Sequence, residues 1–198
     1  MRWVKYKQVI ENFFSLSILN ALNVLLPLVT LPYMLHVVGK ANYGAYSYVY
    51  AVVQYVILFS TYGFNFSATK QISQCRDDKE KVSKIYNAVT ASKTLIALSL
   101  SVLLLLCAKL VFKDGVGTLM FVYGLGMVVG DVLTPIWLFQ GMEKMKYMTI
   151  VNASSKILFT ILIFIVVRAS EDYQLLILLN SCGYLLAGLL SLILVCRQ

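Results

Sequence analysis

Long runs of apolar residues, separated by short polar turns, dominate the chain. Six of these runs have the length of a membrane-spanning helix, which needs roughly 20 predominantly apolar residues. They cover residues 13–37, 43–64, 88–111, 118–140, 148–167 and 173–196. Backbone groups in lipid must bond within their own segment, so each run is expected to be helical. The pattern predicts an all-α, polytopic membrane protein whose six transmembrane helices form a single lobe over residues 1–198.

The composition agrees with a membrane protein and argues against nucleic acid as a partner. The chain is 60% hydrophobic and 13% charged, whereas a soluble domain is nearer half apolar and a quarter charged. Its net charge of +8 would suggest nucleic acid in a soluble protein. Here the basic residues lie mainly in turns, where they indicate topology and contacts with lipid headgroups. We therefore expect membrane lipids as partners and no nucleic acid.

The distribution of basic residues predicts the orientation in the membrane. Of the 17 lysines and arginines, twelve lie on the side of the N-terminus, Lys156 lies inside a run, and four lie on the opposite side, namely Lys40, Lys109, Lys113 and Arg168. The side richer in lysine and arginine is normally cytoplasmic. The first run is interpreted as a retained span, because asparagines interrupt it and no convincing cleavage site follows. With six spans, both termini are expected in the cytoplasm.

One long polar segment, residues 67–87, separates the second and third runs. It contains Asp77 and Asp78 directly before a mixed-charge stretch with Lys79, Glu80 and Lys81. An aspartate at this place can cap the first turn of a helix. We expect a capped helix that continues into the third span, with a solvated charged face.

Two charged residues inside the spans are the first candidates for a site. Asp131 lies on the fourth run and Lys156 on the fifth, about equally far from the turn at Glu143 and Lys144. At 1.5 Å per residue the two side chains would reach a similar depth. Three interpretations stay open: an ion pair that orients two packed helices, a cavity that handles an anionic substrate or a coupling ion, or two residues that never meet.

Other residues are weaker candidates. Lys93 is near the start of the third run, where its ammonium could snorkel to the interface or attract a phosphate at a cavity mouth. Polar groups in lipid need partners, so four amides are expected to face a bundle or cavity: Asn20, Asn23, Gln54 and Asn65. Three prolines are candidates for helix kinks: Pro27, Pro32 and Pro135. The spacing of Gly126 and Gly130 indicates close helix packing.

The sequence contains none of the common catalytic motifs considered for this chain. The chain has no Walker A loop, no G-x-S-x-G and no H-E-x-x-H motif, and it has a single histidine, His36. Its four cysteines form no C-x-x-C pair, so they indicate neither a zinc site nor a disulfide framework. We expect no enzymatic activity, no metal and no cofactor.

Three segments carry a family resemblance. The sequence YGFNFSATKQIS at 62–73, PIWLFQGMEKMKYMTIVN at 135–152 and PLVTLPYMLHVVGKANYGAY at 27–46 resemble motifs of bacterial Wzx-type polysaccharide flippases. These belong to the multidrug/oligosaccharidyl-lipid/polysaccharide exporter superfamily. The resemblance follows the family's order over nearly the whole chain, although the family has about twice as many helices. The chain therefore resembles the N-terminal lobe of a two-lobe exporter fold.

The resemblance implies a function and partners. It implies flipping of an undecaprenyl-diphosphate-linked oligosaccharide across the bacterial inner membrane for O-antigen or capsule synthesis. The cavity candidates would be Lys156, Asp131 and Lys93, and a second lobe would come from a homodimer or a missing C-terminal half. Two alternatives remain: the lobe of a cation-coupled multidrug exporter, and a non-transporting membrane scaffold that binds glycan-assembly enzymes.

Overall fold

The computed structural model describes residues 2–112 and 115–196, which are helical apart from short turns and contain no strand. The helices are α1 (Arg2–Val37), α2 (Gly39–Thr61), α3 (Phe64–Gln74), α4 (Lys79–Val111), α5 (Val116–Val132), α6 (Ile136–Gly141), α7 (Met145–Val166) and α8 (Tyr173–Cys196), with a 3-10 turn η1 (Ser170–Asp172) before α8. The predicted all-α fold is confirmed. Within the described residues, six segments are long and apolar enough to cross a membrane.

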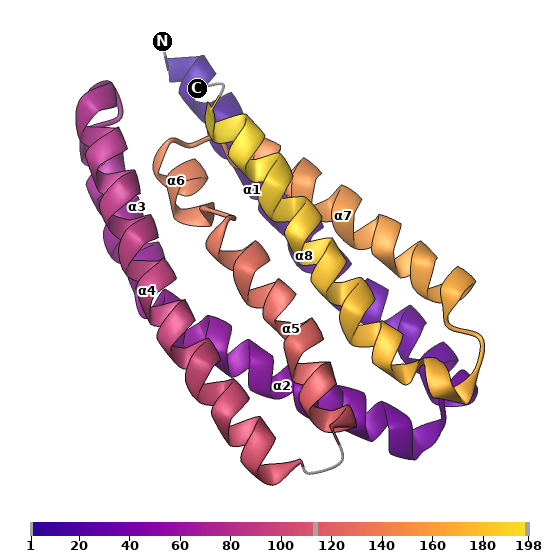
Figure 1. Cartoon of the computed structure of the whole chain (residues 1–198). Coiled ribbons are helices and arrows are strands. Elements are labelled where there is room, and N and C mark those ends of the chain that lie inside the picture. Colours follow the sequence, from indigo (N-terminus) through magenta and orange to yellow (C-terminus); the bar gives the residue numbers. More distant parts are fainter. Residues whose placement is uncertain (1, 113–114, 197–198) are drawn as a thin grey trace.

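The helices form one bundle with both ends of the chain on the same side. In Figure 1 the N- and C-termini lie together at one end, next to α6, and α5 lies between α4 and α8. The core is formed mainly by α2, α4, α5 and α8, around residues such as Val53, Phe121, Met127 and Leu176. Many other large apolar side chains, including Leu98 and Leu106 on α4, are exposed. An apolar outer surface is expected where lipid is the solvent.

Helices α5 and α8 share the most extensive contact among the described helices, and glycines allow a close approach. A Cβ on Gly130 would come within 2.3 Å of the backbone carbon of Tyr184, and one on Gly126 within 2.9 Å of the Ser181 side chain. No side chain fits at Gly130 unless the two backbones separate. The predicted packing role of Gly126 and Gly130 is therefore confirmed.

The polar segment 67–87 is mostly helical, because α3 covers its first part and α4 its last part. The α2 helix ends at Thr61, and Gly63 adopts φ +78°, a left-handed conformation that glycine adopts without steric cost. The chain then forms α3, which packs against α6 through Ile72, Trp137 and Leu138. An ion pair of 2.7 Å between Arg76 and Glu143 joins the two turns that follow α3 and α6.

The predicted start of the next helix is confirmed. The carboxylate of Asp78 accepts a hydrogen bond of 3.1 Å from the backbone N–H of Lys81, so Asp78 is the N-cap of α4. This bond and the ion pair with the Lys81 ammonium favour the charged carboxylate, so the pKa of Asp78 is lowered. The helix runs without a break from there to Val111.

The predicted fourth span, residues 118–140, is interrupted in the structure. Helix α5 ends at Val132, and α6 begins at Ile136, directly after Pro135. Proline has no N–H for the helix and its ring crowds the preceding turn, so the helix cannot pass through this point unchanged. By contrast, Pro27 and Pro32 lie inside the continuous helix α1.

Candidate functional site

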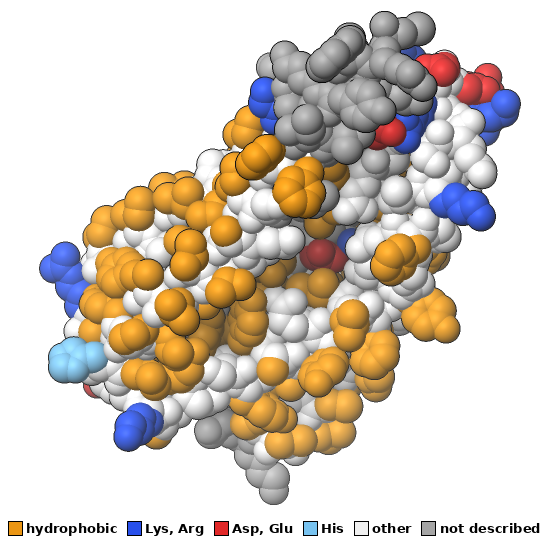
Figure 2. Space-filling view, turned by 180° about the vertical axis from the view of Figure 1, so that it is seen from behind, with side chains coloured by type: hydrophobic (Ala, Val, Ile, Leu, Met, Phe, Trp, Pro, Cys, Tyr) orange, Lys and Arg blue, Asp and Glu red, His pale blue; other side chains and the backbone are white. Residues whose placement is uncertain are grey.

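A cavity of about 840 Å³ lies between α1, α2, the α5–α6 junction, α7 and α8. This volume is within the range of small-molecule sites, about 300–1,000 Å³. Figure 2 shows a hollow in this mostly apolar surface, with an acidic side chain visible at its bottom. The wall contains two charged residues, Asp131 and Lys156, and five amides: Asn20, Asn23, Gln140, Asn152 and Asn180.

Helical spacing places these side chains in the wall. On α7 the lining residues form two adjacent rows whose members are three or four positions apart, which is one face of a helix: Asn152, Ser155, Lys156, Phe159, Thr160 and Ile163. On α2 the same spacing gives Tyr43, Tyr46, Ser47 and Tyr50. Polar groups are thus gathered on inward faces, while the outward face of α7 carries exposed apolar residues such as Ile157 and Ile161.

Lys156 presents a positive charge to the cavity. Its ammonium donates a hydrogen bond to Oδ1 of Asn23 on α1, and both residues line the cavity. Within the described residues, the ion pairs found do not include Lys156. Because an amide oxygen is neutral, it orients the ammonium and leaves its charge uncompensated.

The end of α5 places Asp131 at the cavity wall. In a continuous helix the carbonyl of Asp131 would accept a bond from the N–H of residue 135, but Pro135 has none. The chain turns instead: the N–H of Thr134 donates to the Asp131 carbonyl at 3.2 Å. The Thr134 hydroxyl donates to the carbonyl of Gly130 at 2.7 Å. The broken helix thereby keeps its last carbonyls bonded.

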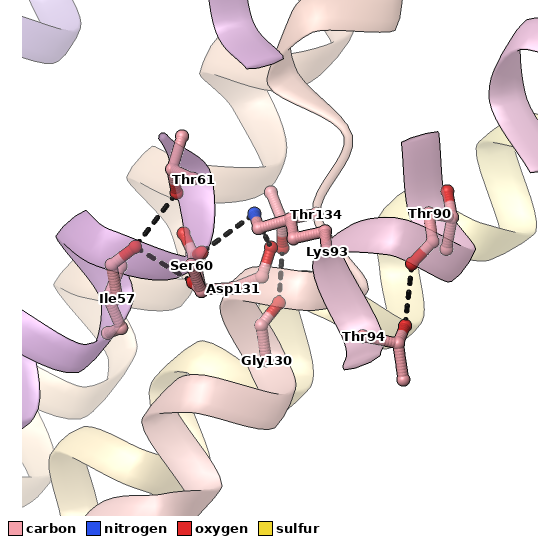
Figure 3. A network of polar contacts seen from close by, with 9 residues as sticks. All are labelled: Ile57, Ser60, Thr61, Thr90, Lys93, Thr94, Gly130, Asp131 and Thr134. Carbon is pink, nitrogen blue, oxygen red and sulfur yellow. Dashed lines mark hydrogen bonds and ion pairs between the residues drawn. The ribbon is translucent and has the colours of Figure 1, made fainter. Parts of the chain in front are cut away.

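Lys93 on α4 completes this arrangement. Its ammonium lies 2.8 Å from Oδ2 of Asp131 and donates a hydrogen bond of 2.9 Å to the backbone carbonyl of the same residue. Lys93 is only 4% exposed. Figure 3 shows the lysine reaching across from α4 to the end of α5, beside Ser60 and Thr134. One ammonium therefore neutralises the carboxylate and adds a second hydrogen bond to the carbonyl that Pro135 deprives of its usual helical donor.

This pairing corrects two expectations. Asp131 does not form an ion pair with Lys156, although both residues line the same cavity. Lys93 does not snorkel to the interface, because its ammonium is buried and forms an ion pair with the Asp131 carboxylate. The sequence could not reveal this partner, since Lys93 and Asp131 lie 38 residues apart on helices with no shared motif.

Two tyrosine hydroxyls of the wall are held by amides. Nδ2 of Asn180 donates to the hydroxyl of Tyr46 at 3.1 Å, and Nε2 of Gln54 donates to the hydroxyl of Tyr184 at 3.1 Å. The Tyr46 hydroxyl accepts this bond and keeps its own proton for a further partner, whereas the Tyr184 hydroxyl is also hydrogen-bonded to the side chain of Tyr50. The Asn180 amide thus orients Tyr46 without using the donor capacity of its hydroxyl.

The remaining candidates are divided between the cavity and other places. Asn20, Asn23 and Pro27 line the cavity, whereas Gln54 acts on it through Tyr184. Asn65 lies on α3, where its carbonyl accepts a hydrogen bond from the Thr69 hydroxyl. Neither Asn65 nor Pro32 is among the residues that line the cavity.

Several wall residues were not among the sequence candidates. The amides Gln140, Asn152 and Asn180, the buried Ser155 and the tyrosines of α2 and α8 all line the cavity. The spacing of polar residues on α7 was visible in the sequence and would have identified Asn152 and Ser155. The described residues contain no cluster of three or more His, Cys, Asp or Glu side chains able to hold a metal.

Comparisons with known proteins agree on one family. The model of a family described as polysaccharide biosynthesis protein matches residues 9–198. Two curated proteins carry the name "Putative O-antigen transporter". The one from Escherichia coli (strain K12) is 33% identical over 188 residues, which cover 95% of this chain and 45% of that protein. The one from Shigella dysenteriae is 28% identical over 186 residues, which cover 93% of this chain and 46% of that protein. The chain thus spans about half the length of the curated relatives it matches. No solved structure matches it significantly.

Proposed function

The chain belongs to the polysaccharide biosynthesis protein family, and on that premise we propose that it forms one lobe of a flippase for lipid-linked oligosaccharides. The substrate class is an undecaprenyl-diphosphate-linked glycan. Its headgroup would move across the bacterial inner membrane during the synthesis of surface polysaccharide such as O-antigen or capsule. The six apolar segments are those of a multi-pass membrane protein.

The observation that carries the proposal is a polar, positively charged cavity inside an apolar helical bundle. A sugar–diphosphate headgroup is anionic and hydrogen-bonding, so the hydrocarbon layer excludes it. The cavity offers amides, hydroxyls and the ammonium of Lys156, whose hydrogen-bond partner is the neutral Asn23 amide. The lipid tail could stay in the bilayer while the headgroup lies against this wall. Lys156 is the residue we assign to the anionic part of the headgroup.

The arrangement of the chain ends supports the proposed topology. Both termini lie at the same end of the bundle in Figure 1, as six crossings require. The excess of lysine and arginine on that side favours the cytoplasm. A second lobe, from a second copy or from further chain, would complete a two-lobe transporter around the hollow seen in Figure 2.

The test is Lys156→Ala in the protein at its natural length, expressed in cells that lack their own copy. We expect loss of surface glycan at an unchanged protein level, because the headgroup loses its cationic contact. The matched control is Lys146→Ala on the same helix, which is exposed and outside the cavity lining, and which should keep normal glycan. Normal surface glycan in the Lys156→Ala cells would contradict the proposal.

A further inference from the structure

One part of the cavity wall is aromatic. Tyr43, Tyr46 and Tyr50 follow one another along α2, with ring centroids 5.7 Å apart for the first pair and 5.9 Å for the second. Tyr184 on α8 lines the same cavity. Aromatic faces carry a partial negative charge, and the axial C–H groups of a pyranose ring are weakly positive. A tyrosine wall therefore presents the surface on which a sugar ring packs.

The polar groups around the tyrosines are already oriented. Asn180 also donates to the carbonyl of Leu176 at 2.8 Å, so both hydrogens of its amide are used and its position is fixed. The hydroxyl of Tyr46 accepts from an amide and retains a proton to donate. The hydroxyl of Tyr184 is held in place by Gln54 and Tyr50. Hydroxyl-rich ligands need donors and acceptors held at fixed places, because each hydrogen bond must replace one to water.

Ser155 supplies an independent sign of a ligand. Six other buried serine or threonine hydroxyls in the described residues each donate to a backbone carbonyl. Ser155 is 2% exposed and lines the cavity, yet its Oγ has no hydrogen-bond partner in the protein. A buried hydroxyl without a partner is costly. It stands next to Lys156 in the sequence, at the edge of the polar wall.

The charge of the wall argues against a purely phosphate-binding site. Of its two charged residues, Asp131 is neutralised by Lys93, which leaves the single positive charge of Lys156. A diphosphate carries more than one negative charge, so this one ammonium can hold only one end of it. The amides, hydroxyls and tyrosines are uncharged, as suits a sugar.

We propose that Tyr46, Tyr184 and Ser155 form a pyranose subsite beside Lys156, which binds the sugar nearest the diphosphate. The aromatic rings pack against the sugar face, and the three hydroxyls bind its ring substituents. This inference rests on the proposed function. It assigns the sugar of the headgroup to the tyrosines and Ser155, and the diphosphate to Lys156. The sugar contacts are separate from the anion contact of Lys156.

The test uses two probes on the purified natural-length protein in detergent. One is the free repeat-unit oligosaccharide of the cell's own surface glycan, without phosphate, and the other is inorganic pyrophosphate. Tyr46→Phe, Tyr184→Phe and Ser155→Ala each remove one hydroxyl, and each should weaken oligosaccharide binding about tenfold while pyrophosphate binding stays unchanged. Lys156→Ala should weaken pyrophosphate binding and leave oligosaccharide binding nearly intact.

The control is Tyr48→Phe, on the same helix but exposed and packed beside Phe112 and Phe121, away from the cavity. It should change neither affinity. Thermal unfolding of each variant identifies any that fails to fold, and Ser155→Ala provides a small second change in that case. Unchanged oligosaccharide affinity in folded Tyr46→Phe and Ser155→Ala would overturn the inference even if pyrophosphate still binds through Lys156. Failure of both probes to bind the wild-type protein would overturn the proposed function itself.

Discussion

Lys93 and Lys156 both lie in apolar segments, and their surroundings differ in kind. The Lys93 side chain is buried, and its ammonium contacts the carboxylate and the backbone carbonyl of Asp131 at the end of α5. Lys156 faces a cavity and is bonded to an amide. The first lysine is neutralised, and it holds a broken helix in place. The second keeps its charge available. The comparison teaches that a charge inside a membrane segment indicates function only once its partner is known.

The largest expected effect separates the two lysines by stability. Lys93→Ala should destabilise the protein by about 3–5 kcal/mol, because it leaves the Asp131 carboxylate and its carbonyl without their cation. Lys156→Ala should change stability by about 1 kcal/mol at most, since it removes a single hydrogen bond to Asn23. Thermal unfolding in detergent and the protein level in membranes measure both.

The double variant Lys93→Leu with Asp131→Leu is the control for the ion pair. Removing both charges together should recover much of the lost stability, because no buried charge remains unpaired. Equal destabilisation by Lys93→Ala and Lys156→Ala would mean that the two lysines do not differ as described.

The second effect concerns the packing that presents Asp131 and Tyr184 to the cavity. Gly130→Ala should cost about 1–3 kcal/mol, because its methyl group would meet the backbone of Tyr184 and separate α5 from α8. Gly44→Ala on α2 is a matched control, since a Cβ there has open space, and it should be neutral or slightly stabilising. Comparable melting temperatures for the two variants would contradict the close α5–α8 contact.

The third effect is a difference in access to water. In a cysteine-free background, Lys156→Cys should react with a membrane-impermeant, polar thiol reagent, because the cavity wall is polar. Ala97→Cys, at a position on α4 that is 4% exposed and packed in the core, should stay unmodified. Labelling followed by mass spectrometry provides the readout. An inert cysteine at position 156 would favour a scaffold over a transporter.

The smallest effect lies outside the spans, at the N-cap of α4. Asp78→Ala should speed hydrogen exchange in the first turn of that helix and leave both lysine regions unchanged, since the cap acts only locally. The pKa of Asp78 is lowered in the folded protein. Its contribution is therefore complete above the usual carboxyl pKa and is lost as the pH falls through the lowered value. Protection of this turn, measured relative to exchange in the unfolded chain, that stays constant as the pH falls through that range would contradict the cap.

The fold could largely be predicted from the sequence, because a lipid bilayer restricts the structures that can cross it. Apolar runs of sufficient length must be helical, and this rule gave the all-α class and the six segments, which the structure confirms. A cap by Asp77 or Asp78 was predicted, because a cap depends on neighbours in the chain, and the structure identifies Asp78. The interruption between Val132 and Ile136 was not predicted, although Pro135 was a candidate kink.

The site could be predicted only in part, for a physical reason. Helical spacing shows which residues share a face, but it does not show which face of another helix lies opposite. Asp131 and Lys156 were recognised as unusual, yet the partner of each came from a distant helix, Lys93 on α4 and Asn23 on α1. The Ser155 hydroxyl could not be identified as unpaired before its surroundings were known.

The separation of Lys93 from Asp131 along the chain also has a consequence for biosynthesis. Lys93 is made 38 residues before Asp131, so α4 leaves the ribosome before its counter-charge exists. A lysine in a lone membrane helix disfavours translocon insertion, by up to about 2.5–3.5 kcal/mol at the helix centre. The long apolar run that follows Lys93 on α4, which includes Leu98 and Leu106, offsets this cost. Release of α4 and α5 from the translocon as a hairpin would bring the two charges together, so the ion pair makes the insertion of one helix depend on the arrival of the next.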